Sequence, residues 1–504
     1  MSRSALGSAL VLIVTVVICF SAGELCFRLI DGYKLTSLSL IPIRQQEAGS
    51  TRESDSYAAR TRLNPSFHLD WYNTNPRDYD RSNNYPLPRD WIRAVRDYKP
   101  QPGERAFIKN ELKFLYNYNW LVDACKTDNG TRVIKHYRIN PGFVYAFKSP
   151  DASTAPQFRL VPRGWNEGED SYNNFGFRGP DINPAKSSRT IRIAFIGAST
   201  TAQGWPFTYP EYAVHFLQLW ANAERLNVHF DVINAGRPGL DSLGIAKIMR
   251  YEVAPLHPDL VVYDPGANDF NMAAYVKLTN PNQTSSSSHG GALPLQNYSA
   301  LLGRVYELIF RAQPEGRTPE HTLTFDFKQA NPNLNETGLP FRLNEQIVDA
   351  KDISEAVRGI DGHLFVTSFI ALPYPGLRLD PERDRLIIDF INQQYWPLTF
   401  SELRDGFNFQ NNVYRELANR DGFNVLDVAR YFPQDPNLFS DVFHFRTQSG
   451  ERLEGWIAAQ LLAPYVRREI VRHELPKPAF IPAPGALAWA RARPIKFNLA
   501  CLRP

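Results

Sequence analysis

Five short apolar runs in the second half of the chain alternate with longer stretches of mixed polar and apolar residues. The runs are IRIAFIG (191–197), HFDVINA (229–235), DLVVYDPG (259–266), HLFVTSF (363–369) and FNVLDVA (423–429). Such runs, separated by helical segments, are typical of parallel strands, and their nearly continuous apolarity indicates a sheet covered on both faces. The pattern predicts an α/β domain over residues 188–475.

The segments around these strands have a different pattern. Residues 35–187 are rich in Tyr, Pro, Asn and Arg and show little periodicity, so we expect an irregular, aromatic-rich N-terminal module. Residues 270–362 form an unusually long connection between the third and fourth strands, and connections of this length are usually lids, binding loops or disordered segments. Residues 476–504 are a Pro-rich basic tail, which we do not expect to add to the core.

The first 34 residues contain the longest apolar stretch. Ser4 to Gly23 are twenty residues without a charge, enough for a helix rising about 1.5 Å per residue to cross roughly 30 Å of hydrocarbon. This stretch predicts a single transmembrane anchor, although a cleaved signal segment fits the same residues. From the short N-terminal flank with Arg3 we expect a single-pass membrane protein whose folded part lies outside the cytoplasm, in a periplasm or at a cell surface.

Composition excludes several classes of function. The 504 residues carry 56 Lys and Arg against 52 Asp and Glu, and this net charge of +4 is too small for a dedicated nucleic-acid binder. The four cysteines have neither CxxC spacing nor the density of a disulfide scaffold. We therefore expect no metal, no other cofactor and no nucleic-acid partner.

Candidate chemistry follows the first three predicted strands. Ser199 comes two residues after Gly197, Gly239 lies in the turn after the second strand, and Asn268 follows the third. The carboxyl ends of parallel strands meet at one edge of a sheet, where open α/β folds bind ligands. A serine there can be a nucleophile, and a glycine amide and an asparagine side chain can donate to an oxyanion. Taken singly, each residue fits ordinary turn or capping chemistry equally well.

A base and its orienting carboxylate follow the fifth strand. Asp441 stands three residues before His444 in FSDVFHF, close enough to hold the second ring nitrogen of the histidine. The four elements occur in the order nucleophile, two oxyanion donors, orienter and base, each after a predicted strand. Their combination is more informative than any one of them.

On these residues the chain resembles the SGNH/GDSL hydrolases. The match is Ser199, Gly239, Asn268 and His444, with Asp441 completing the D-x-x-H block, and it covers about 189–471. The upstream sequence NNFGFRGPDI looks like a stretch found in membrane-anchored members. The resemblance implies a flavodoxin-like three-layer α/β/α fold. It also implies a catalytic Ser199, Asp441 and His444, with an oxyanion hole made of the Ser199 and Gly239 amides and the Asn268 side chain. One position departs from the family, since Ala198 replaces the aspartate of Gly-Asp-Ser.

Three functions are compatible with this sequence. The first is a serine ester hydrolase acting outside the cytoplasm on an acyl ester, with an O-acetylated glycan as one candidate substrate. The second is an O-acyltransferase of an envelope polysaccharide, in which a sugar hydroxyl replaces water and the aromatic-rich module stacks on sugar rings. The third is a non-catalytic scaffold that keeps the fold alone.

Overall fold

A computed structural model describes residues 3–30, 35, 51–78, 172–272, 299, 301, 332–335, 339–373, 379, 384–395, 398, 400–483 and 485–487. The chain forms two compact units. The first comprises Met1–Ser50, Met272–Phe325 and Gly376–Leu398, and the second comprises Thr51–Asn271, Asp326–Pro375 and Thr399–Pro504.

A parallel five-stranded sheet organises the second unit. Its strands are β1 (Thr190–Gly197), β2 (His229–Asn234), β3 (Leu260–Asp264), β4 (His363–Thr367) and β5 (Asn424–Leu426), in the order β2-β1-β3-β4-β5. This is the order of a flavodoxin-like doubly wound sheet. Every residue of β1 and β3 is buried, as expected of apolar strands covered on both faces. The predicted parallel α/β sheet is thus confirmed.

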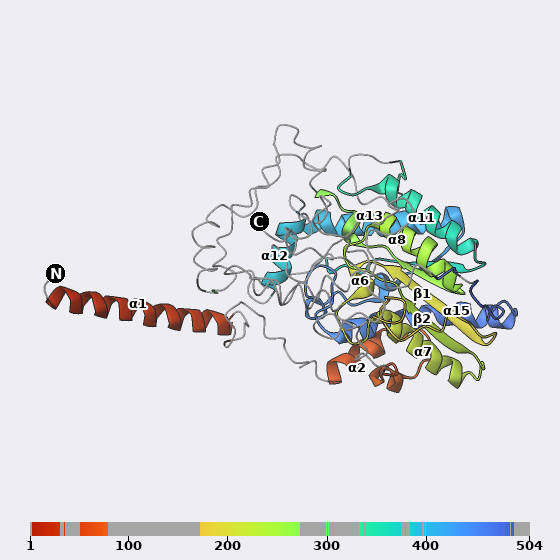
Figure 1. The fold of residues 1–504 in the computed structure, drawn as a ribbon, viewed down its shortest axis with the longest axis horizontal. Helices are drawn as coiled ribbons and strands as arrows, with labels where there is room; N and C mark the ends of the chain where they lie inside the picture. Colours follow the sequence, from red (N-terminus) through yellow and green to blue (C-terminus); the bar gives the residue numbers. More distant parts are fainter. Residues whose placement is uncertain are drawn as a thin grey trace. The chain divides into compact units, whose positions relative to one another are not determined.

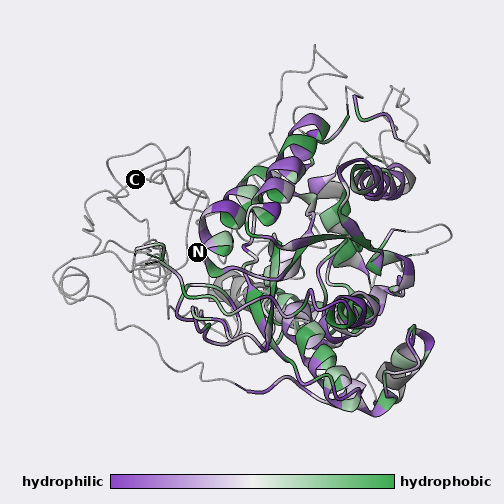
Figure 2. Cartoon of the chain, turned by 90° about the vertical axis from the view of Figure 1, so that its right-hand side faces the viewer, coloured by the Kyte–Doolittle hydropathy of each residue, from purple (hydrophilic) through white to green (hydrophobic). Residues whose placement is uncertain are grey.

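Helices cover the two faces of the sheet. The strand order reverses direction at β1, so right-handed crossovers place α7 and α8 on opposite faces. α7 packs against α15 and α8 packs against α11, which Figure 1 shows on either side of the strands. Helices with both hydrophilic and hydrophobic residues surround the strands in Figure 2. The helical elements of this unit are α2 (Thr51–Arg60), η1 (Leu69–Asn73), α6 (Ser199–Ala202), α7 (Tyr209–Ala223), α8 (Ser242–Ile248), the π-helical turn η2 (Met249–Val253), η3 (Ala254–Leu256), η4 (Ala267–Asp269), α11 (Leu343–Arg358), α13 (Phe400–Asp421), α14 (Val428–Tyr431), η6 (Pro436–Leu438) and α15 (Gln448–Val471).

The long connection between β3 and β4 contains regular structure. Its last part is α11, which buries Leu343, Ala350, Ile353 and Val357 at helical spacing and serves as the crossover between the two strands. The predicted 270–362 insertion therefore includes an ordinary crossover helix of the fold. Of residues 273–338, only 299, 301 and 332–335 are among those described.

Of the predicted N-terminal module, residues 51–78 and 172–187 belong to the sheet-containing unit, whereas Leu35 belongs to the first unit. Phe67 is fully buried, stacks at 6.3 Å on Trp220 of α7 and meets the ring of Trp456 of α15 edge-on at 5.5 Å. The side-chain oxygen of Gln460 accepts hydrogen bonds from the amides of Leu63, at 2.7 Å, and Asn64, at 3.0 Å. Residues 51–78 are thus fastened to α7 and α15 by aromatic packing and hydrogen bonds.

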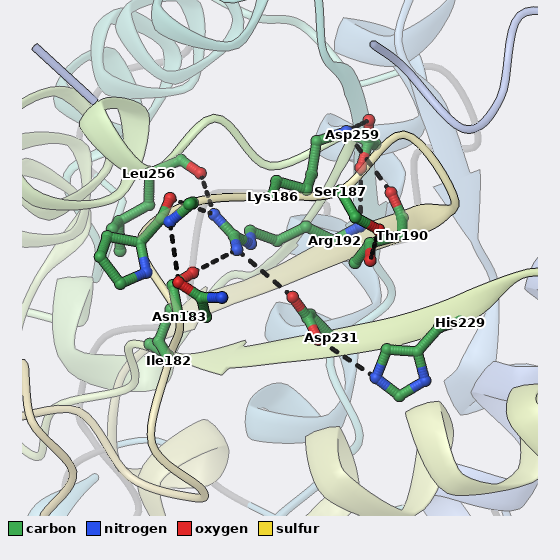
Figure 3. Close-up of polar contacts among 12 residues, drawn as sticks. Ile182, Asn183, Lys186, Ser187, Thr190, Arg192, His229, Asp231, Leu256 and Asp259 are labelled. Atoms are coloured by element: carbon green, nitrogen blue, oxygen red, sulfur yellow. Dashed lines mark hydrogen bonds and ion pairs between the residues drawn. The ribbon is translucent and has the colours of Figure 1, made fainter. Parts of the chain in front are cut away.

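A buried polar network lies at the start of β1, opposite the carboxyl edge of the sheet (Figure 3). Lys186 Nζ lies 2.7 Å from Asp259 Oδ1, and the other carboxylate oxygen accepts the amide of Arg192 at 2.6 Å. The beginning of the predicted tail joins this network, because Lys477 N donates to Asp259 at 3.2 Å and Phe480 pairs with Lys186 in an antiparallel bridge. The first residues of the tail therefore do contribute to the unit.

We predict that Lys186→Met destabilises the protein by about 3–5 kcal/mol, because it leaves the Asp259 carboxylate buried without its cation. Both side chains are only 1% exposed. Urea unfolding followed by circular dichroism measures the loss, and adding Asp259→Asn to the same chain should recover a large part of it. A loss below about 1 kcal/mol for the single variant would contradict a stabilising role for the pair.

The first unit contains α1 (Arg3–Ile30) and α12 (Arg385–Gln394). Glu24 of α1 pairs with Arg28 at 2.6 Å and accepts a hydrogen bond from the Ser299 hydroxyl at 2.7 Å. Cys19 and Cys26 on the same helix are free thiols. In the part of the chain that the structure describes, no helix combines the length and the apolarity that crossing a membrane requires, so the predicted transmembrane anchor is not supported.

Candidate active site

The first strand delivers Ser199 to the carboxyl edge of the sheet. β1 ends at Gly197, and Ser199 opens the short helix α6 after Ala198. A side chain at Gly197 would meet the Thr201 hydroxyl at 2.0 Å, and one at Gly236, after β2, would meet the amide of Ala202 at 2.7 Å. Both glycines are therefore needed, because the serine turn packs directly on its own strand end and on the turn after β2.

Ser199, His444 and Asp441 form a continuous chain of hydrogen bonds. Ser199 Oγ lies 2.7 Å from His444 Nε2, and His444 Nδ1 lies 2.7 Å from Asp441 Oδ2. A neutral imidazole protonated at Nδ1 donates to the carboxylate, which leaves Nε2 to accept the serine hydroxyl. This geometry gives the hydroxyl a general base and gives the base an orienting carboxylate.

Local backbone structure fixes the Asp441–His444 pair. Asp441 Oδ1 accepts the amides of Phe443 and His444, both at 2.9 Å, so the D-x-x-H spacing closes into a turn around the carboxylate. The amide of Ser440 donates to the carbonyl of His444 at 2.8 Å, and the amide of Leu372, after β4, donates to the carbonyl of Val442 at 2.8 Å. The loop is thereby tied to the sheet, and the imidazole is held in place.

Gly239 and Asn268 lie in two turns at the same edge of the sheet. Gly239 has φ 77°, a conformation that favours glycine, in the turn between β2 and α8. The exposed Asn268 side chain, after β3, donates one amide proton to the carbonyl of Leu240 at 2.9 Å. Because the carboxamide carries two protons, a second remains to donate to a bound group. The structure thus links the two predicted oxyanion turns to each other.

The NNFGFRGPDI sequence reaches this edge from the N-terminal side. Asn173 Oδ1 accepts the amides of Phe175 at 2.9 Å and Phe177 at 3.1 Å, which folds the motif into a compact turn. The amide of Arg178 donates to the carbonyl of Asn234 at the end of β2, and its guanidinium donates to the carbonyl of Trp205 at 2.7 Å. The motif therefore braces the loop that follows the Ser199 helix.

A buried carboxylate that the sequence does not reveal lies beside Ser199. Asp264, the last residue of β3, accepts hydrogen bonds from the hydroxyls of Thr200 at 2.7 Å, Thr201 at 3.0 Å and Thr367 at 3.0 Å. Burial raises the pKa of Asp264, against the lowering effect of these hydroxyl donors. The carboxylate ties α6 to the ends of β3 and β4. Its sequence signal, a threonine pair after the serine and an aspartate ending a buried strand, becomes specific only once the strands are paired.

Among the described residues, no group of three or more His, Cys, Asp or Glu side chains is arranged to hold a metal ion. Cys125 and Cys501 lie outside the described residues.

No model of a known protein family matches this chain, and no curated protein sequence matches it. Several solved structures are similar to part of it. A GDSL-like lipase from Bacteroides thetaiotaomicron is 12% identical and covers 56% of this chain and 89% of its own, with a TM-score of 0.26. The acetyl xylan esterase AlAXEase is 16% identical over 54% of this chain and 99% of its own, with a TM-score of 0.30. A catalytic mutant of the acetylxylan esterase Axe2 from Geobacillus stearothermophilus is 15% identical over 56% of this chain and 94% of its own, with a TM-score of 0.29.

Proposed function

We propose that this chain is a serine-dependent acyl-ester hydrolase. The observation that carries the proposal is the hydrogen-bonded chain Ser199–His444–Asp441 at the carboxyl edge of the parallel sheet. A hydroxyl that shares its proton with an imidazole, itself held by a carboxylate, is the arrangement that makes a serine nucleophilic near neutral pH.

The proposed reaction has two halves. Ser199 Oγ attacks the ester carbonyl while its proton passes to His444 Nε2, and Asp441 stabilises the imidazolium that forms. When the tetrahedral intermediate collapses, the C–O bond to the alcohol breaks and the same proton goes to the departing oxygen. Water then attacks the acyl-serine by the reverse sequence, which releases the carboxylic acid and restores the serine.

Three groups are proposed to stabilise the negative oxygen of the tetrahedral intermediate. They are the amides of Ser199 and Gly239 and the second amide proton of Asn268. Ser199 is the first residue of α6, so its amide has no acceptor within the helix. The Asn268 side chain donates only one of its two amide protons to the carbonyl of Leu240. Loss of one such donor typically lowers kcat by about a hundredfold or more.

We expect an organophosphonate ester with a p-nitrophenol leaving group to modify one residue per chain, Ser199, because its phosphorus mimics the carbonyl under attack. The measurement is p-nitrophenol release in stoichiometric amount together with peptide mass analysis, with Ser199→Ala as the unreactive control. A modification at another residue, or none in wild-type protein, would overturn the proposal. If turnover of an acetyl ester transfers the acyl group to an added glycan instead of releasing acid, the site is that of an acyltransferase.

A further inference from the structure

A buried carboxylate connects the two proposed oxyanion turns. Asp269 directly follows Asn268, and its two carboxylate oxygens lie 3.3 and 3.2 Å from the amide nitrogen of Ser242. The Ser242 hydroxyl is 3.1 Å from Asp269 Oδ1. Ser242 is the first residue of α8, three positions after Gly239, and Asp269 is only 2% exposed. These contacts add to the Asn268–Leu240 hydrogen bond and connect the Gly239 turn to the Asn268 turn through buried groups.

The same hydroxyl also contacts a second carboxyl group. Ser242 Oγ lies 2.6 Å from Asp349 Oδ2 on α11, and Asp349 is 4% exposed. A serine hydroxyl has one proton and can donate to only one of the two carboxylates at a time. Two ionised carboxylates on one hydroxyl would leave one contact without a proton. The geometry is satisfied when one of the two acids is protonated and donates to Ser242.

The surrounding charges favour retention of that proton. Asp241, from the Gly239 turn, faces both Asp269 and Asp349, and two acids of α11, Glu345 and Asp352, also face Asp349. The facing cation is Arg342, which lies 3.0 Å from Asp241, 2.9 Å from Glu345 and 3.5 Å from Asp269. The buried hydroxyls of Tyr263 and Tyr414 face the pair from β3 and α13.

We propose that Asp269 is a positioning residue of the ester-hydrolysis site, which shares a proton with Ser242 and Asp349 and so holds the Gly239 and Asn268 turns in their oxyanion-binding geometry. The inference rests on the proposed function. Burial, and to a lesser degree Asp241, raises the pKa of Asp269 to about 7, against the lowering effect of Ser242 and Arg342. Burial also raises the pKa of Asp349. The link is strongest well below pH 7 and weakens as the pH rises through about 7, when the shared proton leaves.

Two substitutions of Asp269 separate positioning from general stability. In Asp269→Asn the amide oxygen still accepts from Ser242 N and the NH₂ group still donates to Ser242 Oγ, which imitates the protonated acid. We expect kcat within about threefold of wild type at pH 6.5. Asp269→Leu keeps the branch at Cγ but replaces both oxygens with methyl groups, which removes both contacts. We expect its kcat to fall about tenfold or more with KM changed less than twofold, since a donor displaced by a fraction of an ångström acts on the transition state.

The decisive readout is the ratio of wild-type to Asp269→Asn kcat for p-nitrophenyl acetate, measured in the full chain between pH 6.5 and pH 8.5. Any pH dependence that is common to both proteins cancels in this ratio. We expect the ratio to fall by about threefold or more, because only wild type loses its shared proton. A constant ratio overturns the proposal. If Asp269→Leu does not fold, Ser242→Ala takes its place, since it removes the shared hydroxyl.

The matched control is Asp259→Asn, another buried aspartate, at the opposite edge of the sheet. It should lower thermal stability and leave kcat and its pH dependence unchanged. Ser199-dependent turnover with equal kcat in wild type and Asp269→Leu overturns the positioning role alone. Turnover that is the same in Ser199→Ala as in wild type overturns the proposed function, and the positioning role with it.

Discussion

Ser199→Ala is expected to lower kcat for p-nitrophenyl acetate by about 10⁴-fold or more, with the fold intact. The reason is that the hydroxyl oxygen 2.7 Å from His444 Nε2 is the proposed attacking atom, and alanine has no nucleophilic group in its place. Residual hydrolysis comes from the oxyanion donors and from substrate binding, which act on attack by water. Initial rates at saturating substrate, with circular dichroism to verify folding, provide the measurement.

His444→Ala should cause a loss of similar size, and the double variant should be no slower than either single one. The two residues act as a unit, because without the base the serine keeps its proton and without the serine the base has nothing to activate. Ser187→Ala and His229→Ala are the matched controls, since both residues lie at the opposite edge of the sheet (Figure 3). Losses that multiply in the double variant would mean that the residues act separately, and would refute the proposed mechanism.

The sheet was predictable because its strands carry a strong local signal. Parallel strands covered on both faces must be apolar nearly throughout, and all five apolar runs coincide with strands to within a few residues. The third run, for example, becomes β3 (Leu260–Asp264), which is buried at every position. The sequence of a single strand does not determine the order of the strands in the sheet. The flavodoxin-like arrangement was expected from the resemblance to a known family.

Elements whose stability comes from distant partners were harder to predict. α11 carries a helical repeat of buried apolar residues, yet it lies at the end of a long polar connection and was included in a predicted insertion. Phe67 packs on Trp220 and Trp456, which are far away along the chain. Nothing within residues 51–78 indicates those partners, so this segment was predicted as part of a separate irregular module.

In the candidate site, too, some residues could be predicted from local sequence and others depend on distant partners. Ser199, Gly239, Asn268, Asp441 and His444 each follow a predicted strand, so topology alone places them at one edge, and D-x-x-H spacing pairs the last two. The supporting carboxylates could not be found in this manner. Asp264 becomes informative only when three threonine hydroxyls from two other segments reach it. The sharing of Ser242 between Asp269 and Asp349 likewise depends on how α8 and α11 pack.

Asp441→Asn is expected to lower kcat by about 10³- to 10⁴-fold while the turn around it remains formed. The asparagine oxygen still accepts the amides of Phe443 and His444, which now bond to Asp441 Oδ1 at 2.9 Å. Its NH₂ group then faces His444 Nδ1 and forces that nitrogen to become an acceptor. The imidazole proton moves to Nε2, which donates to Ser199 instead of accepting from it, so the base is held in the wrong tautomer.

This mechanism separates Asp441→Asn from simple loss of a contact. Asp441→Ala removes the orienting group but leaves both tautomers accessible, so we expect a smaller loss in kcat than for asparagine, with a larger drop in thermal stability because two backbone amides lose their acceptor. Asp231→Asn is the control, since Asp231 pairs with Arg192 at the opposite edge of the sheet (Figure 3). If Asp441→Asn retained wild-type kcat, the tautomer of His444 would not depend on Asp441, and the carboxylate would act only to close its own turn.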